Sequence, residues 1–145
     1  MSFGFGVGDM IVVSKLAIQA RTALKESTGS VVDYQKLTRM RAHLGSSLAV
    51  FEVEFSILSG NSLPQSVVDE TKLGLDECSQ HLADIDEMTT KFKTSLGKTP
   101  GSTKTYKNIK HKLEWRDVRE SVVEIFSLFQ TRVSLLAMLL WVSHA

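Results

Sequence analysis

The sequence is short of cysteine, proline and net charge. Cys78 is the only cysteine, so the chain cannot form an intramolecular disulfide, and we expect an intracellular, cytoplasmic protein. Only two prolines occur, which leaves room for long helices. The formal net charge of +1 argues against attraction of the whole molecule to nucleic acid. Any charged binding site must therefore be local.

The sequence also lacks an uninterrupted apolar run of the roughly 20 residues that span a bilayer. The longest run, Val133–Val142, is half that length and contains Ser134, and the opening residues lack the basic region of a signal peptide. From Val118 to Val142, however, apolar residues recur at spacings of three and four, and little polar surface remains after Arg132. We interpret this stretch as a central helix that the other helices of a bundle cover.

Three further amphipathic segments precede it. Asp9 is expected to cap a first helix that ends at Gly29, and Ser30 with Asp33 resembles a capping box for a second helix that ends at Ser59-Gly60-Asn61. A third helix is expected from Pro64 to Gly97. The sequence thus predicts an all-α, up-and-down bundle of four main helices with room for a short fifth before Asp117, in one domain over residues 1–145.

Enzyme motifs are incomplete. Gly97-Lys98-Thr99 imitates the end of a phosphate-binding loop, but Phe92 stands where that motif requires its first glycine. Cys78 and His81 form at best half of a zinc site, and no Glu-x-x-His sequence for a di-iron bundle occurs. We therefore expect no enzyme activity, no cofactor, no metal and no small-molecule substrate.

Two local charge excesses stand out, and a solvated surface is the simplest explanation of each. Residues 98 to 119 include seven cations and only two carboxylates. The cations are Lys98, Lys104, Lys107, Lys110, Lys112, Arg116 and Arg119. The third helix carries seven carboxylates against three lysines: Asp69, Glu70, Asp76, Glu77, Asp84, Asp86 and Glu87. The basic patch suits an anionic membrane or an acidic protein, and the two patches together would permit head-to-tail self-association. No stacking platform for nucleic acid accompanies them.

Three stretches carry a resemblance to a known family: the opening Met1-Ser2-Phe3-Gly4-Phe5-Gly6-Val7-Gly8-Asp9, the segment Lys112-Leu113-Glu114-Trp115, and the closing apolar run from Val133 to Leu140. Together the chain resembles the HeLo-like helical N-terminal domain of fungal NLR-like (STAND) and ubiquitin-like-domain proteins. The resemblance implies a non-enzymatic effector or signalling domain at the N-terminus of a larger protein. Relatives of this kind act in immunity, programmed cell death and heterokaryon incompatibility.

Two functions follow as hypotheses. In the first, the domain self-associates or binds a protein partner when its parent protein is activated. In the second, it is recruited to the membrane on activation and perturbs the bilayer as a cell-death executor. Phe3, Phe5 and Val7 form the candidate membrane or partner segment in either case.

Overall fold

The computed structural model describes residues 5–26, 29–93 and 106–144, and every regular element in these ranges is helical. The elements are, in chain order, α1 (Phe5–Lys25), α2 (Ser30–Ser62), α3 (Gln65–Thr89), the 3-10 helix η1 (Thr90–Phe92) and α5 (Tyr106–His144). The all-α fold class predicted from the sequence is confirmed.

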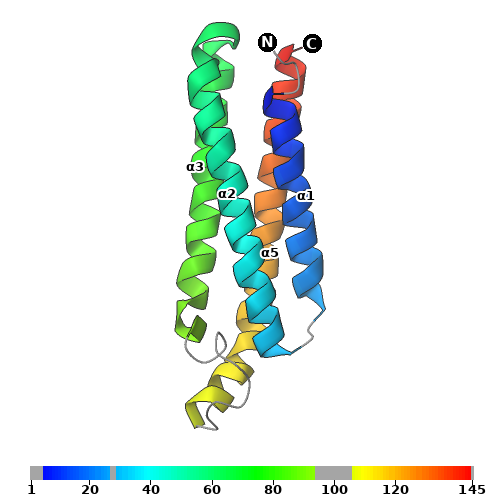
Figure 1. Ribbon diagram of the computed structural model, residues 1–145, viewed down its shortest axis with the longest axis vertical. Helices are drawn as coiled ribbons and strands as arrows, with labels where there is room; N and C mark the ends of the chain where they lie inside the picture. The colour runs from blue at the N-terminus through cyan, green and yellow to red at the C-terminus, as the bar shows by residue number, and fades with distance from the viewer. Residues whose placement is uncertain (1–4, 27–28, 94–105, 145) are drawn as a thin grey trace.

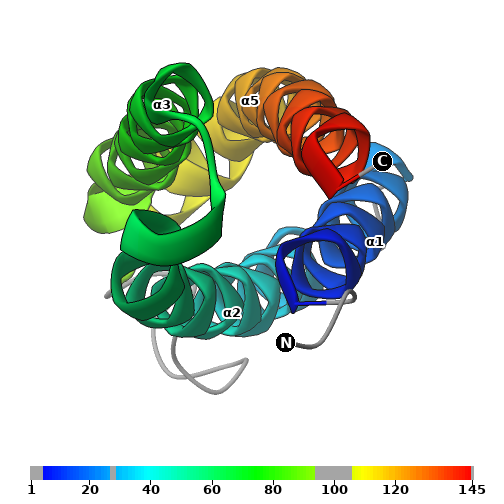
Figure 2. The ribbon, with the colours of Figure 1, turned by 90° about the horizontal axis from the view of Figure 1, so that it is seen from above.

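The four long helices run alternately up and down (Figure 1). Viewed along the bundle, they form a ring in which α1 lies between α2 and α5, and α3 lies between α2 and α5 (Figure 2). The start of α1 and the end of α5 therefore lie at the same end of the bundle, which we call the terminal end. The opposite end, where α2 and α5 begin, is called the far end.

Several predicted helix boundaries are wrong. Helix α1 begins at Phe5, so Asp9 lies inside it and is not its cap, and α2 continues through Ser59-Gly60-Asn61 to Ser62. The expected capping box is absent as well, because α2 starts after Gly29, whose φ of 115° suits glycine, and no side chain caps it.

From Tyr106 onward, the predicted short fifth helix before Asp117 is not a separate element, since α5 is continuous over 39 residues. The third helix ends earlier than expected, at Thr89, and η1 follows it. The Thr89 and Thr90 hydroxyls donate hydrogen bonds to the carbonyls of Ile85 and Asp86, at 2.7 and 2.6 Å, which is a common cause of distortion in a last helical turn. The predicted end at Gly97 lies outside the described residues.

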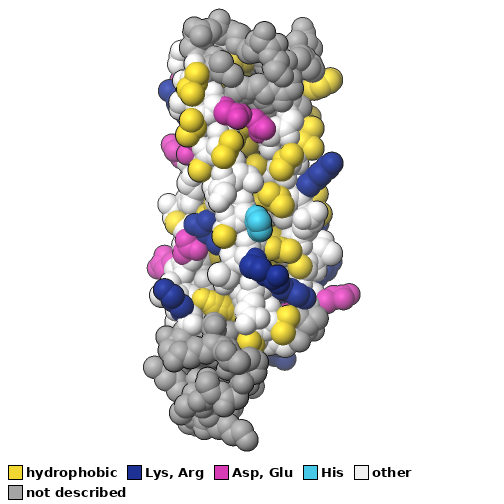
Figure 3. All heavy atoms as spheres, in the orientation of Figure 1, with side chains coloured by type: hydrophobic (Ala, Val, Ile, Leu, Met, Phe, Trp, Pro, Cys, Tyr) yellow, Lys and Arg dark blue, Asp and Glu magenta, His cyan; other side chains and the backbone are white. Residues whose placement is uncertain are grey.

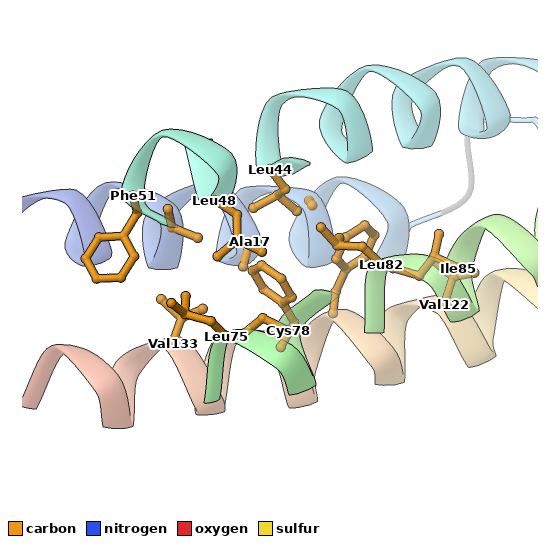
Figure 4. Close-up of a cluster of buried hydrophobic side chains, with 14 of the residues drawn as sticks. Ala17, Leu44, Leu48, Phe51, Leu75, Cys78, Leu82, Ile85, Val122 and Val133 are labelled. Atoms are coloured by element: carbon orange, nitrogen blue, oxygen red, sulfur yellow. The ribbon is translucent and has the colours of Figure 1, made fainter. Parts of the chain in front are cut away.

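One face of each long helix supplies the core (Figure 4). The buried apolar side chains of α1 are Met10, Val13, Ala17, Ala20 and Leu24, and those of α5 after its first turns are Val122, Phe126, Phe129, Val133, Leu136 and Leu140. Helix α2 contributes a stripe that includes Leu44, Leu48 and Phe51, and α3 contributes one that includes Leu75, Leu82 and Ile85. These residues recur at the spacing of one helical face.

At the far end, Trp115 joins three elements. Its ring packs edge-on against Phe92 of η1, with centroids 5.3 Å apart, and lies 5.9 Å from the ring of Tyr34. Its indole N–H donates to the buried Asp33 carboxylate at 3.4 Å. Trp115 is thus a core residue, as expected from its place in the sequence, and it ties the start of α5 to α2 and η1.

Helices α3 and α5 approach closely at Gly74. A Cβ atom at this position would lie 2.7 Å from a methyl group of Leu136, closer than real side chains come. Beside Gly74, Arg132 of α5 pairs with two carboxylates of α3: its Nη2 lies 3.4 Å from Glu70, and its Nε lies 3.0 Å from Glu77. Glu70, Gly74 and Glu77 share one helix face, so a small residue and two charges together fix this contact.

Helix α5 is less covered than the sequence predicted. It forms one wall of the bundle, and the others cover only the side that faces the interior. Leu128, Leu135 and Met138 are 58%, 50% and 63% exposed, although they belong to the apolar stretch that we expected to be buried. The reason is geometric, because in a ring of four helices each helix keeps an outer face in contact with solvent.

Adjacent leucines of α5 test this orientation. Leu136 is 1% exposed, so Leu136→Asp should place a carboxylate in the core and cost on the order of several kcal/mol, comparable to the whole stability of a domain. Leu135→Asp makes the same change at a half-exposed position and should leave the fold intact. Thermal unfolding followed by circular dichroism measures both variants, and equal melting temperatures for the two would contradict the packing of α5.

Candidate interaction surface

The outer side of α5 near the terminal end carries an exposed apolar row. Its members recur at spacings of three and four residues: Leu128, Leu135, Met138 and Val142, with Thr131 as the polar member and Trp141 beside them. Val142 and Trp141 are 67% and 53% exposed. Because an exposed contiguous apolar patch on a protein marks an interaction site more often than a scattered residue does, this row is the first candidate.

Helix α1 extends the row sideways. The register of the two helices is given by hydrogen bonds between Ser14 and Ser134, 3.2 Å, and from Arg21 to Ser127, 3.3 Å. Ile11 and Ile18 lie three residues before and four residues after Ser14, so they share its side of α1 and lie next to this seam. Both side chains are exposed. We call the combined surface of Ile11, Ile18, Leu128, Leu135, Met138, Trp141 and Val142 the apolar face.

Toward the far end, the outer side of α5 changes character. From Leu128 toward the far end, the exposed residues on the same side of α5 are Glu124, Glu120 and Asp117. The exposed Arg116 is next to Asp117. On the face that Figure 3 draws, most lysine and arginine side chains lie from the middle of the bundle toward the far end. The apolar face is therefore confined to the terminal half of the molecule.

The predicted N-terminal segment reaches this end. Phe3 lies outside the described residues, whereas Phe5 and Val7 belong to the first turn of α1 and their side chains are not described. One turn later, Asp9 faces Glu54 of α2, and a hydrogen bond with Asp9 raises the pKa of the Glu54 carboxyl. Because the pKa of the Glu54 carboxyl is higher in the folded chain than in the unfolded chain, the protonated carboxyl stabilises the fold at low pH. This contribution is lost as the pH rises through the folded pKa. This contact between α1 and α2 is thus less favourable at neutral pH.

The predicted basic patch divides into four parts. Lys98 and Lys104 lie outside the described residues, and Lys107, Lys110 and Lys112 belong to the first turns of α5. Arg116 is exposed. Arg119 is not available in the same way, because its Nη1 donates hydrogen bonds to the carbonyls of Leu24 and Lys25, at 2.6 and 3.0 Å, and so caps the end of α1.

The predicted acidic face does not form a single surface. Glu70 and Glu77 turn toward Arg132 of α5, and Asp86 turns the other way, toward α2, where it forms a two-pronged ion pair with Arg41 at 2.8 and 2.9 Å. The remaining members are Asp69, Asp76, Asp84 and Glu87, of which Asp69 and Asp84 accept hydrogen bonds from Gln65 and Gln80. Three of the seven predicted carboxylates therefore hold helices together.

The N-terminal segment and the basic patch lie at opposite ends. Arg116 and Met138 belong to the same helix, and 22 residues at 1.5 Å each separate them by about 33 Å. A membrane that meets the terminal end of the bundle would thus be far from the described basic residues. The sequence-based idea that the two segments work together on one lipid surface has no support from this geometry.

Cys78 is fully buried, and burial raises the pKa of its thiol to about 12. Its neighbour in the half zinc motif, His81, is partly exposed, and the described residues contain no group of three or more potential metal ligands. Cys78 is a small apolar core residue in this structure, as the sequence pattern indicated.

The apolar face was missed in the sequence because the period of the helix reports which residues share a side, but not which side is covered. Every residue of α5 in this face was recognised as apolar, and all were assigned to the core. Ile11 and Ile18, apolar residues of the first predicted helix, are likewise exposed. The signal that could have found them is the width of the apolar arc, which exceeds what two neighbouring helices can cover.

Comparisons with known proteins add no assignment: no family model, no curated protein and no solved structure matches this chain. Within the described residues, α5 is the one helix that is long and apolar enough to cross a membrane by length and composition. Only 28% of that apolar stretch is buried in the bundle, whereas the core helix of a bundle is mostly buried.

The buried thiol gives a prediction about pH. The unfolded chain loses the Cys78 proton near pH 9.0 and the folded chain near pH 12, so burial of the neutral thiol favours folding fully below pH 9.0 and progressively less above it. Cys78→Ala should therefore lose less stability than wild type between pH 9 and pH 11. Urea unfolding at a series of pH values measures the difference, and parallel curves for the two proteins would contradict the buried thiol.

Proposed function

We propose that this chain is a non-enzymatic effector or signalling domain that acts by self-association or by binding a protein partner through the apolar face. The single observation that carries the proposal is the row on α5, where Leu128, Leu135 and Met138 are each at least half exposed and point away from the core. Burial of such side chains contributes about 1.5–3 kcal/mol each when complete, which is ample for a specific contact.

Two features support an interaction role over catalysis. The sequence contains no complete catalytic constellation, and the described surface presents an apolar face on α1 and α5. The resemblance of the sequence to HeLo-like N-terminal domains of fungal NLR-like proteins agrees with this proposal, because the resemblance implies a non-enzymatic effector or signalling domain.

The apolar face is tested by Leu135→Glu combined with Met138→Glu. If the face mediates association, wild type should form concentration-dependent oligomers or bind its partner at about 0.5 M salt, where contacts between exposed charges are screened. The double variant should remain monomeric at that salt concentration, with an unchanged circular dichroism spectrum. Val32→Glu, which introduces the same charge at an exposed apolar residue near the far end, is the control and should behave as wild type. Light scattering after size-exclusion chromatography measures the mass, and equal association of the double variant and wild type would contradict the proposal.

A specific observation favours a second candidate function, in which the domain inserts α5 into a bilayer. From Ile125 to Val142 the only charged residue is Arg132. In the bundle, this guanidinium is held by Glu70 and Glu77, so insertion would require the loss of both ion pairs and the transfer of a charge into lipid. Arg132 would then act as the residue that keeps α5 in its soluble arrangement.

Arg132→Leu tests this second candidate, since it removes both the ion pairs and the charge. If α5 inserts, dye leakage from lipid vesicles should rise well above the wild-type level. Arg116→Leu removes an exposed arginine outside the apolar stretch and should leave leakage unchanged. Absence of leakage with wild type and Arg132→Leu, in both anionic and neutral vesicles, would reject membrane insertion.

A further inference from the structure

Two grooves of opposite charge lie in the far half of the bundle. One lies between α3 and α5, and the other lies on the α2 side near Lys93. They have similar volumes, about 600 and 680 Å³. Neither groove includes a residue of the apolar face, so they form a separate surface feature of the bundle.

The groove between α3 and α5, here the acidic groove, is lined by Asp84, Glu87, Met88, Lys91, Asp117, Val118 and Ser121. Lys91 is the one cation among these lining residues, and its Nζ is paired with Glu114 at 2.7 Å. Met88 is 38% exposed and Val118 is partly buried, so the groove combines apolar side chains with carboxylates. Glu87 and Asp117 are both exposed.

The groove on the α2 side, here the basic groove, is lined by Tyr34, Gln35, Thr38, Arg39 and Lys93. Arg39 and Lys93 are exposed, and its described lining residues include no carboxylate. The nearby Asp86 does not neutralise them, because its two oxygens are engaged by Arg41. The rim of this groove therefore carries the charge opposite to that of the acidic groove.

We propose that copies of this chain associate head to tail, with the rim of the acidic groove of one copy against the rim of the basic groove of the next. The occupant is a second copy because the chain itself presents both halves of a complementary pair, with carboxylates on one side of α3 and an arginine and a lysine on the other. Two grooves on different sides of one molecule cannot pair with each other across a two-fold axis at a single interface. The contact is heterologous and leads to a ring or an open chain of copies.

This inference deepens the self-association half of the proposed function but rests on different residues. Association through exposed charges is screened as ionic strength rises, since the Debye length falls from about 14 Å at 0.05 M to about 4 Å at 0.5 M salt. Association through the apolar face should persist at the higher salt concentration. The failure of one contact can therefore be told apart from the failure of the other.

The test uses two charge-reversed variants, both in the background of Leu135→Glu and Met138→Glu so that the apolar face is inactive. Variant one carries Glu87→Lys and Asp117→Lys in the acidic groove, and variant two carries Arg39→Glu and Lys93→Glu in the basic groove. All four positions are exposed, so the folds should be retained, which circular dichroism checks. Sedimentation velocity at about 0.05 M salt measures assembly of the background protein, of each variant, and of their equimolar mixture.

The background protein should show association that depends on concentration and disappears at high salt. Each variant alone should associate at least about tenfold more weakly, because its altered groove repels the intact groove of the next copy. The mixture should recover association, since the intact acidic groove of variant two fits the intact basic groove of variant one. A background protein that stays monomeric at low salt, or a mixture that associates no better than its components, would overturn the proposal.

Discussion

The close contact of α3 with α5 at Gly74 is the constraint on which the rest of the bundle depends. Gly74 leaves no side chain between the helices, so Leu136 can enter the core, and Arg132 is brought within reach of Glu70 and Glu77 on the same face of α3. This contact fixes the rotation of α5 about its own axis. With Leu136 turned inward, Leu135 and Met138 must turn outward.

The apolar face is thus a consequence of helix rotation together with composition. A sequence that is apolar nearly all round can present only one side to the interior of a four-helix ring, and the remaining side stays exposed. The exposed residues cost solubility without adding to the core, which supports the proposal that another surface covers them in the working state of the protein. The same argument applies to a protein partner, to a second copy and to a bilayer.

The charged residues fall into two groups, those that pair within the bundle and those that remain at its surface. Arg41, Arg119 and Arg132 are used inside the bundle, to join α2 with α3, α1 with α5, and α5 with α3. The charges left at the surface, such as Glu87 and Asp117 on one side of α3 and Arg39 and Lys93 on the other, are the ones that can act between molecules. Counting charges along the chain could not separate these two roles.

The helical period in the sequence determined the all-α class, the four long helices and most of the core, including Leu44, Phe51, Leu82 and Phe126, because side-chain spacing along a helix is a local property. It did not determine that α2 runs past Gly60 or that α5 is one continuous helix, because local signals such as Ser59-Gly60-Asn61 are weak preferences that do not by themselves end a helix. Nor did it determine the partners of the charged residues: Glu70 and Glu77 meet Arg132, which lies more than 50 residues away, only when α3 and α5 pack together. The tertiary structure alone decided which apolar side of α5 is covered, since that depends on where its neighbours stand.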